Sequence, residues 1–198
     1  MAKVGLSKPY YAIYSASNGV VTYSNGANMG KAVSTSIEPD DNDTSFFYAD
    51  NGPAESAHVF SGGSLSMEID RLDANVIAAL FGITAGSSVT PVGTTLDFKA
   101  DSVIPYVGVG LIAKNIVDNT AVWMAIVLPK VQFVTPTFDL TPQGEEVEFS
   151  GNQLEAAILR DDTTDGKWIR LGYFSSEPDA ETWIKSVLSI TSTPATTE

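Results

Sequence analysis

The chain contains no cysteine and a single histidine, His58. Without cysteine there are neither disulfides nor thiolate metal sites, so cysteine usage leaves the redox compartment open. One histidine excludes metal sites built from several histidines. Because His58 stands beside Ala57 and Val59 in a strand-like stretch, we expect a packed or solvated side chain and not a catalytic one.

Basic residues are scarce. The 198 residues carry 11 Lys and Arg against 24 Asp and Glu, a formal net charge of −13. Nucleic-acid binding works through Lys and Arg that displace phosphate counterions, so this balance argues against it, and it is equally unfavourable at an anionic membrane surface. The charge suits a protein that must stay in solution or that should repel DNA.

Long hydrophobic runs are also missing. The N-terminus has no apolar core for a signal peptide, so we expect a soluble chain that does not use the general export route. The longest run, Ala121–Leu128, is too short to cross a bilayer and has no polar face. Such a strand is covered on both sides, by its own domain or by a neighbouring subunit, and its own domain is the default.

Catalytic and metal-binding signals are weak. The segment 161–166, Asp-Asp-Thr-Thr-Asp-Gly, has some spacing of a calcium loop, but its twelfth position is Gly172 instead of a bidentate Glu, which favours a hairpin turn. Glu145 and Glu146 form a pair of the type that glycosidases use, but nothing places them across a cleft. The chain is therefore predicted to be no enzyme and to bind neither cofactor nor metal.

What the chain does contain is a repeat. Phe-Ser-Gly-x-x-Leu-x-x-x-Ile occurs at 60–69 and again at 149–158. In each copy apolar residues alternate with polar or small ones, which is typical of a strand with one buried face. Two equivalent strands suggest a pseudo-symmetric pair within a sheet.

The remaining pattern predicts a mainly β protein that forms a single domain over residues 1–190, followed by a flexible tail at 191–198. Asn18-Gly19 predicts a hairpin turn, and Asp73 and Gly82 bound a short helix. A C-terminal helix is predicted over 178–189, with one apolar stripe. Further strands are expected at 10–15, 20–23, 32–37, 44–49, 60–70, 94–99, 103–113, 121–134, 145–150, 153–160 and 167–174.

Several of these pieces together resemble a known family. The acidic stretch that leads into Phe47-Tyr48-Ala49-Asp50-Asn51, the strand Gly-Gly-Ser-Leu-Ser-Met-Glu-Ile at 62–69 and the helix end Leu80-Phe81-Gly82 are similar to the major tail (tail tube) proteins of long-tailed, non-contractile bacteriophages. Leu-Pro-Lys-Val-Gln-Phe at 128–133, residues 145–149 and the second repeat strand extend the similarity over roughly residues 10–175, in the family's order. The chain differs from members that carry an additional immunoglobulin-like C-terminal domain.

The resemblance implies a β-sandwich or half-barrel subunit with one or two flanking helices. Six copies would form a ring in which the inner sheets close into a β-barrel, and stacked rings would form the conduit for the genome. It also implies a virion location in the tail, assembly in the host cytoplasm, and a tape measure protein, tail terminator and distal tail proteins as partners. DNA would pass through without specific binding.

Two sets of residues are candidates for this role. Glu68, Asp70 and Glu155 lie opposite the apolar residues of the repeat strands and are predicted to line an acidic lumen, with outer solvent as the alternative location. The stretch 38–55 has six acids and no base and is predicted to form an extended loop or arm that contacts the neighbouring ring. Its contact residues would be Phe46, Phe47, Tyr48 and Asp50, with a plain intramolecular hairpin as the alternative.

Other functions stay open. A carbohydrate- or receptor-binding β-sandwich could use Tyr10, Tyr11 and Tyr14 as a sugar platform, although packing on a strand face explains these residues equally well. The tube protein of a contractile injection machine would share the tail-tube architecture. A lytic or glycan-cleaving domain is the remaining enzymatic alternative.

Overall fold

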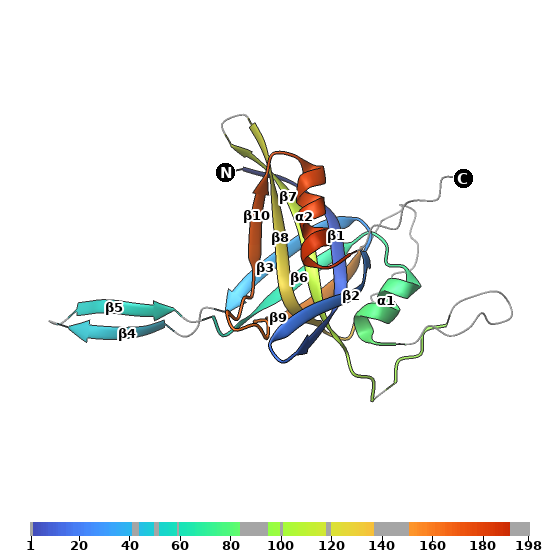
Figure 1. Ribbon diagram of the computed structural model, residues 1–198, viewed down its shortest axis with the longest axis horizontal. Coiled ribbons are helices and arrows are strands. Elements are labelled where there is room, and N and C mark those ends of the chain that lie inside the picture. Colours follow the sequence, from blue (N-terminus) through green and yellow to red (C-terminus); the bar gives the residue numbers. More distant parts are fainter. Residues whose placement is uncertain are drawn as a thin grey trace, which may run out of the picture.

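A computed structural model describes residues 2–40, 44–49, 52–58, 60–83, 95–99, 101–117, 120–136 and 151–190. Within these ranges the chain forms an eight-stranded antiparallel sheet, a separate two-stranded hairpin and two short helices (Figure 1). The prediction of a mainly β protein with short helices is confirmed. The elements are β1 Ala2–Ser17, β2 Val20–Asn28, β3 Ala32–Asp40, β4 Thr44–Ala49, β5 Gly52–His58, β6 Gly62–Ile69, α1 Ala74–Phe81, β7 Tyr106–Val117, β8 Thr120–Phe133, β9 Asn152–Leu159, β10 Arg170–Phe174 and α2 Glu177–Val187.

The sheet has the order β2-β1-β7-β8-β9-β6-β3, and β10 pairs with β8 beside this path. Strand β8 changes partner along one edge: residues 123–127 pair with β10, and residues 130–133 pair with β9. From this branch point β9, β6 and β3 bend away from the other strands. The sheet does not close into a barrel. The two repeat strands, β6 and β9, are direct neighbours with Leu65 opposite Ala156 and Met67 opposite Leu154, as expected of a strand pair.

The first core lies between the two halves of the bent sheet. Its largest fully buried side chains come from both halves and from α1: Met29, Leu65, Met67, Ile69, Leu80, Leu111, Leu128, Phe133, Leu154 and Ile158. The sequence alternation in β6 and β9 explains their share of this core, because every second residue points to the same face.

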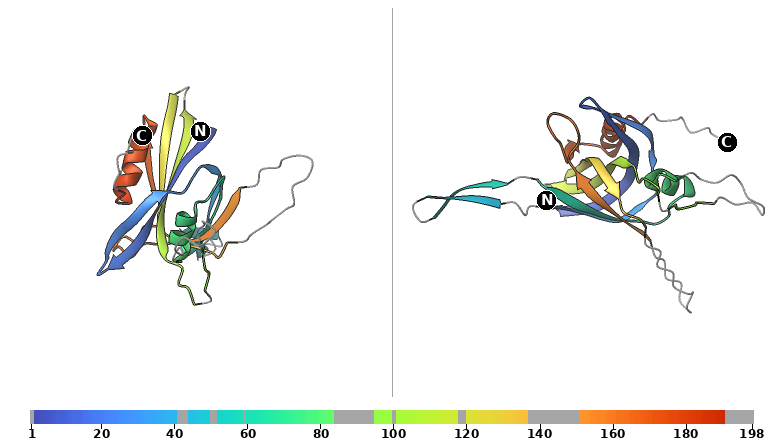
Figure 2. Two further views of the ribbon diagram at one scale, coloured as in Figure 1. Left: turned by 90° about the vertical axis from the view of Figure 1, so that its right-hand side faces the viewer. Right: turned by 90° about the horizontal axis from the view of Figure 1, so that it is seen from below.

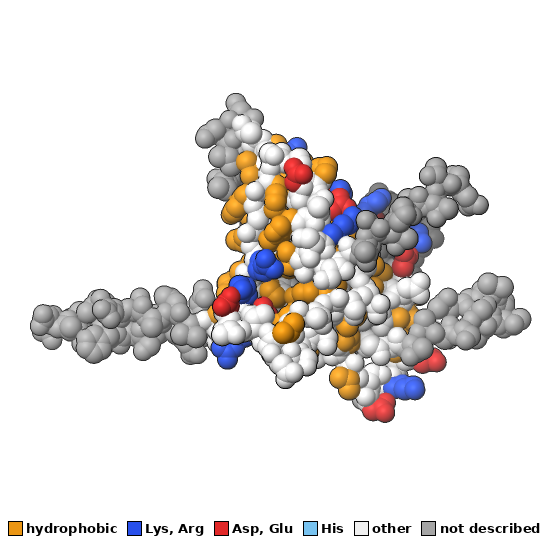
Figure 3. Space-filling view, viewed as in Figure 1, with side chains coloured by type: hydrophobic (Ala, Val, Ile, Leu, Met, Phe, Trp, Pro, Cys, Tyr) orange, Lys and Arg blue, Asp and Glu red, His pale blue; other side chains and the backbone are white. Residues whose placement is uncertain are grey.

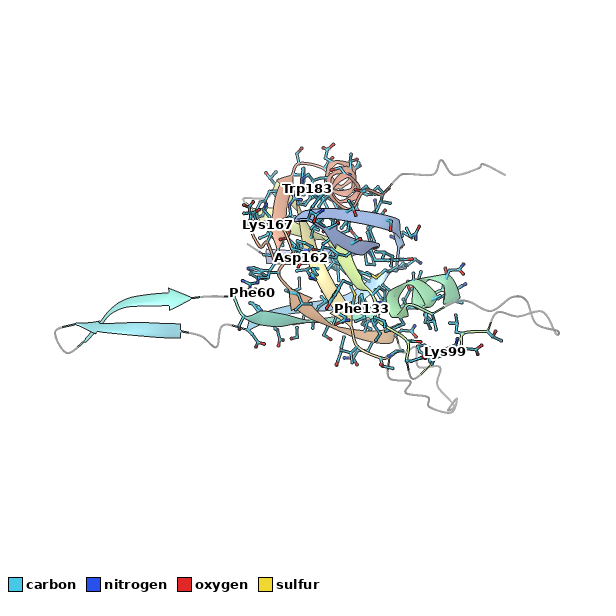
Figure 4. All side chains as sticks on the ribbon, turned by 60° about the horizontal axis from the view of Figure 1, so that its bottom comes forward. Phe60, Lys99, Phe133, Asp162, Lys167 and Trp183 are labelled. Atoms are coloured by element: carbon cyan, nitrogen blue, oxygen red, sulfur yellow. The ribbon has the colours of Figure 1, made fainter. Side chains whose placement is uncertain are left out.

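The second core lies on the other face of β1, β7 and β8, under helix α2. Ala180 and Ile184 of the helix are fully buried there, and Ala125 and Val127 of β8 supply the floor. Figure 4 shows Trp183 with α2 on one side of the sheet and Phe133 on the other. The apolar run of β8 is thus covered by α2 on one face. On the other face the first core buries Leu128 and only partly covers Ile126.

Helix α2 begins after Ser176, whose side chain accepts a hydrogen bond from the backbone N–H of Asp179 at 3.3 Å. Acidic residues in its first turn and Lys185 in its last turn complement the helix dipole. The predicted helix at 178–189 is confirmed, with bounds shifted by one residue at the start and two at the end. No helix in the described part of the chain has the length and hydrophobicity to cross a bilayer.

Turn residues behave as predicted at two places. Asn18 and Gly19 both have positive φ, 51° and 76°, which is the geometry of a two-residue hairpin turn between β1 and β2. Gly82, at φ 65°, ends α1 in the left-handed conformation. Asp73 is the N-cap residue of α1, but its side chain makes no capping hydrogen bond.

Two expectations are wrong, and one strand was missed. Residues 95–99 contain only an isolated bridge at Leu96, so no strand forms there. Strand β5 was not predicted, although the stretch around His58 was described as strand-like. The segment 161–166 is not a hairpin turn, because β9 and β10 both pair with β8 and not with each other. The predicted strand at 145–150 and the tail at 191–198 lie outside the described residues.

Two glycines of β7 allow α2 to approach the sheet closely. A Cβ atom on Gly110 would lie 2.4 Å from Ile184 Cγ2, and one on Gly108 would lie 2.7 Å from Leu188 Cδ2. Real Cβ atoms do not come this close to other atoms, so an added Cβ must displace Ile184 at position 110. At position 108 it must displace Leu188 and the Tyr23 ring, whose Cε1 is 2.6 Å away. Glycine at both positions therefore permits close packing.

We therefore expect Gly110→Ala to lower the free energy of unfolding by about 1–3 kcal/mol, because overpacking a core forces side chains and backbone to move. Chemical denaturation monitored by tryptophan fluorescence measures this change. Gly5→Ala is the matched control in another strand, since its new Cβ meets nothing closer than Lys114 Cβ at 3.9 Å. Equal stability of the two variants would contradict the close-packing account.

Candidate functional site

The polar face of the β3-β6-β9 part of the sheet is the first candidate site. The register places its side chains in cross-strand rows: Ser34, Glu68 and Gln153 form one row, and Ser36, Ser66 and Glu155 form the next. The opposite face of β6 and β9 is buried in the first core, so this face points outward. Glu68 is half-buried and Glu155 is exposed.

Charge on this face has one sign. Strands β3, β6 and β9 contain four acids, Glu38, Asp40, Glu68 and Glu155, and no Lys or Arg. The carboxylates are staggered, because Glu38, Glu68 and Glu155 each stand opposite serine or an uncharged partner in the register. Like charges directly opposite each other destabilise a sheet, so the staggering lets the face stay acidic at little cost.

Glu68 is also held in place. Its Oε2 accepts a hydrogen bond from Ser34 Oγ at 3.4 Å, and its side chain lies over Gly151, where a Cβ atom would come within 2.6 Å. Glycine at 151 therefore leaves room for the Glu68 carboxylate to lie along the sheet.

Asp70, the third predicted lumen residue, lies elsewhere. It follows the end of β6 in a bend, and its Oδ1 accepts a hydrogen bond from the backbone N–H of Lys31 at 3.1 Å. This contact ties the β2–β3 connection to the end of β6. The structure thus brings Glu68 and Glu155 onto one face and places Asp70 at its border.

Sequence reasoning missed the contribution of β3 to this face. Ser34, Ser36 and Glu38 belong to it, although Glu38 was assigned to the acidic arm. The alternation over 32–37 was visible in the sequence, but nothing there indicated that β3 pairs with β6.

The β4–β5 hairpin is the second candidate site. The two strands form their own sheet, in which Phe46 is opposite Ser56 and Phe47 is opposite Glu55. The hairpin extends away from the body as an arm (Figures 1 and 2). The predicted arm at 38–55 is therefore corrected in its bounds: residues 38–40 belong to β3, and the projecting part is a hairpin that continues to His58. Asp50 lies outside the described residues.

A polar cluster lies beside an open pocket of about 440 Å3 near the base of this arm. Lys130 Nζ donates to Asp162 Oδ2 at 2.8 Å and lies 4.6 Å from the centre of the Tyr106 ring. The Tyr14 hydroxyl donates to the same carboxylate at 2.7 Å. Burial, and then this hydrogen bond, raises the pKa of Tyr14 to about 12. The pKa of Asp162 is lowered, mainly by the hydrogen bond from Lys130. The cluster is thus a charged pair whose partners are already satisfied.

The proposed sugar platform is not present. Tyr10, Tyr11 and Tyr14 are at most 8% exposed. Tyr11 belongs to the first core, Tyr10 to the second, and Tyr14 packs edge-on against Tyr23. The tryptophans are engaged as well: Trp168 stacks on Phe60 with ring centres 4.4 Å apart.

No metal site is found in the part of the chain that the structure describes. Asp161, in the connection between β9 and β10, is 8% exposed and accepts from the backbone N–H groups of Thr163 and Lys167 at 3.3 and 2.8 Å. Its carboxylate stabilises this turn and does not face a cation site. Glu145 and Glu146 lie outside the described residues.

A clamp of ionic contacts fastens α2 to β1. Glu181 accepts hydrogen bonds from the Tyr10 hydroxyl at 2.7 Å and from Lys185 Nζ at 2.6 Å, and it also pairs with Lys8. Burial alone would raise the pKa of Glu181, but the hydrogen bonds from Lys185, Lys8 and Tyr10 outweigh it and lower the pKa to about 2.

The chain matches no protein-family model and no curated protein sequence.

The clamp gives a pH prediction. The folded pKa of Glu181 lies below its ordinary value of 4.5, so its stabilisation is full above that value and is lost as the pH falls toward about 2. We expect Glu181→Gln to lower the free energy of unfolding at pH 7 by roughly 2 kcal/mol, with the difference from wild type shrinking toward pH 2. Urea titrations at several pH values measure both effects. Asp165→Asn, in an exposed pair with Lys167, is the control, and an equal loss in that variant would contradict the clamp.

Proposed function

We propose that this protein is the subunit of a bacteriophage tail tube, which polymerises as stacked, ring-shaped hexamers into an acidic conduit for the genome. The observation that carries the proposal is the polar face of β3, β6 and β9, which has acids and serines and no Lys or Arg. A wall along which DNA slides must not bind phosphates, and counterion-displacing cations are what such binding requires.

Electrostatic repulsion from such a wall is short-ranged. At physiological ionic strength it extends over about 8 Å, which is enough to keep a close-fitting duplex away from the wall. In the proposed ring Glu68 and Glu155 face the channel and Asp70 lies at its rim. The apolar back of the same strands stays in the core of each subunit.

The free edges of the sheet support ring formation. In the described part of the chain β2 and β3 end the sheet, and β10 is a third edge. Unpaired edges invite pairing with another chain, and a closed ring removes them. The subunit fold that we propose is accordingly the half-barrel of tail tube proteins, whose sheets continue into those of the neighbouring subunits.

The β4–β5 arm is proposed to join successive rings. An isolated two-stranded hairpin is marginally stable in water, so an arm with the sequence Phe46-Phe47-Tyr48 needs a partner surface. Aromatic residues are strong interface contributors, which fits them to this role.

The remaining parts of the proposal follow from the tube. The partners are further copies of the chain together with the tape measure, tail terminator and distal tail proteins, and the location is the virion tail after assembly in the host cytoplasm. A contractile injection machine would use the same subunit architecture with a sheath around it. The carbohydrate-binding alternative loses its proposed tyrosine platform, since these side chains are buried.

The lumen assignment predicts that Glu68→Lys together with Glu155→Lys slows genome ejection without preventing tube assembly, because the new cations bind passing phosphates. Ejection from virions with these substitutions is timed by dye release, and electron cryomicroscopy of the tubes locates both positions. Asp101→Lys, a charge reversal in an exposed residue before β7, is the control. Carboxylates that point away from the tube axis would refute the assignment.

The arm predicts a separate defect. Replacing residues 42–58 by a short Gly-Ser linker should leave folded subunits and rings that do not stack, because the inter-ring contact is missing. Negative-stain electron microscopy measures tube length, and deletion of residues 191–198 serves as a control that keeps the arm. Tubes of full length from the armless variant would disprove the stacking role.

A further inference from the structure

An open apolar groove of about 430 Å3 lies between β3 and the β1-β7-β8 part of the sheet. It forms where the two halves of the bent sheet diverge. Its walls carry no acidic or basic side chain. The main lining residues are Leu6, Val33, Ile37, Ala113, Met124 and Ile126.

The apolar surface continues beyond the groove onto β10. Leu171 and Tyr173 are the register partners of Ile126 and Met124 and therefore share their face. They are 49% and 55% exposed, and Val33 on the other wall is 55% exposed. Hydrophobic side chains reach the surface along β8 and β10 (Figure 3). A continuous exposed apolar surface of this kind marks an interaction site.

The free edge of β3 and the side-chain oxygen of Asn115, both beside the groove, lack hydrogen-bond partners within the described chain. Strand β3 is an edge of the sheet, so the N–H and C=O groups of its free side are available for pairing. Asn115 continues the face of Ala113 and is 2% exposed, yet its Oδ1 accepts no hydrogen bond in the described structure. A surface with these properties is incomplete in the single chain.

The arm is a suitable occupant. It leaves the body at the Asp40 and Gly62 ends of β3 and β6 and extends outward from it (Figures 1 and 2). An engineered apolar cavity of about 150 Å3 holds one benzene, so the groove has room for two aromatic rings. The sequence of β4, Thr-Ser-Phe-Phe-Tyr-Ala, offers three aromatic residues.

Charge also favours this match. The stretch 38–55 has six acids and no base, and no acid lines the groove to repel it. Lys31, which stands just before β3, forms no ion pair within the described chain.

We propose that the groove of one copy receives the β4–β5 arm of a second copy, with Phe46, Phe47 and Tyr48 packed between β3 and β8 and the arm lying along the free edge of β3. This inference rests on the proposed function, in which the two copies belong to neighbouring rings. Because arm and groove are different surfaces, the contact is heterologous and repeats from ring to ring without closing on itself.

A complementation experiment tests the proposal. One variant loses the arm contacts through Phe46→Ser, Phe47→Ser and Tyr48→Ser and keeps its groove. A second variant keeps its arm and loses the groove through Val33→Glu and Leu171→Glu, two exposed positions where charge leaves the core intact. Neither variant should form tubes alone. Mixed together, they should form assemblies of twice the mass of either alone and no larger. The first variant supplies only working grooves and the second only working arms, so one assembly of each kind can join and no third can follow.

Sedimentation velocity and negative-stain electron microscopy of wild type, both variants and the mixture give the readout, with circular dichroism as a check of folding. Val20→Glu is the matched control, because Val20 is 62% exposed but lies on β2 away from the groove. Tubes of wild-type length from the groove variant, or a mixture without mass doubling, overturn this inference and leave the tail tube function standing. A wild type that never assembles overturns both.

Cross-linking gives an independent readout, since the chain has no native cysteine. Chains with Val33→Cys mixed with chains with Phe47→Cys should form disulfide-linked dimers during assembly, at least tenfold faster than the control pair Val20→Cys and Phe47→Cys. A link within one chain that carries both Val33→Cys and Phe47→Cys would show that the arm folds back onto its own groove and would refute the exchange between copies.

Discussion

Pro129 stands at the point where strand β8 changes partners. Proline has no N–H group and is normally excluded from a central strand. Here the edge of β8 is unpaired between Val127, the last residue opposite β10, and Lys130, the first opposite β9. On the other edge the β7 register shifts at the same level, between Val107 and Val109. The missing N–H group of Pro129 thus costs no ladder hydrogen bond. The change of partner on one edge of β8 and the register shift on the other edge occur at this residue.

This branch separates two surfaces with different chemistry. Beyond it, β9, β6 and β3 fold back, so that one face completes the first core and the other carries the staggered carboxylates. Before it, β7, β8 and β10 continue as a ribbon that α2 covers on only one face. The apolar groove therefore follows from the divergence of the sheet, and the acidic face lies on the outer side of the strands that fold back.

Much of the local structure was predictable because local chemistry decides it. The Asn18-Gly19 turn requires positive φ, the period of two in β6 and β9 requires a buried face, and Ser176 to Lys185 carries the signals of a capped helix. Pairing between distant strands was not predictable from these signals. The alternation of β3 does not say that it joins β6, and nothing in 160–169 says that β9 and β10 share an edge of β8. For this reason Glu38 was assigned to the arm and Asp70 to the acidic face. In the structure Glu38 belongs to β3, and Asp70 lies in the bend after β6.

The two faces of β8 are covered to different extents, and this explains why the apolar groove and the acidic face differ as surfaces. Sequence reasoning required both faces of Ala121–Leu128 to be covered, with the chain's own domain as the default cover. Helix α2 meets this requirement over Ala125 and Val127, whereas Met124 and Ile126 remain half-buried at the open groove. An apolar residue left at the surface loses the stabilisation of about 25 cal/mol for each square ångström that stays in water. In the tube that we propose, the half-covered face is therefore the place where a second copy gains most from binding, and the acidic face, which gains nothing from burial, faces the channel.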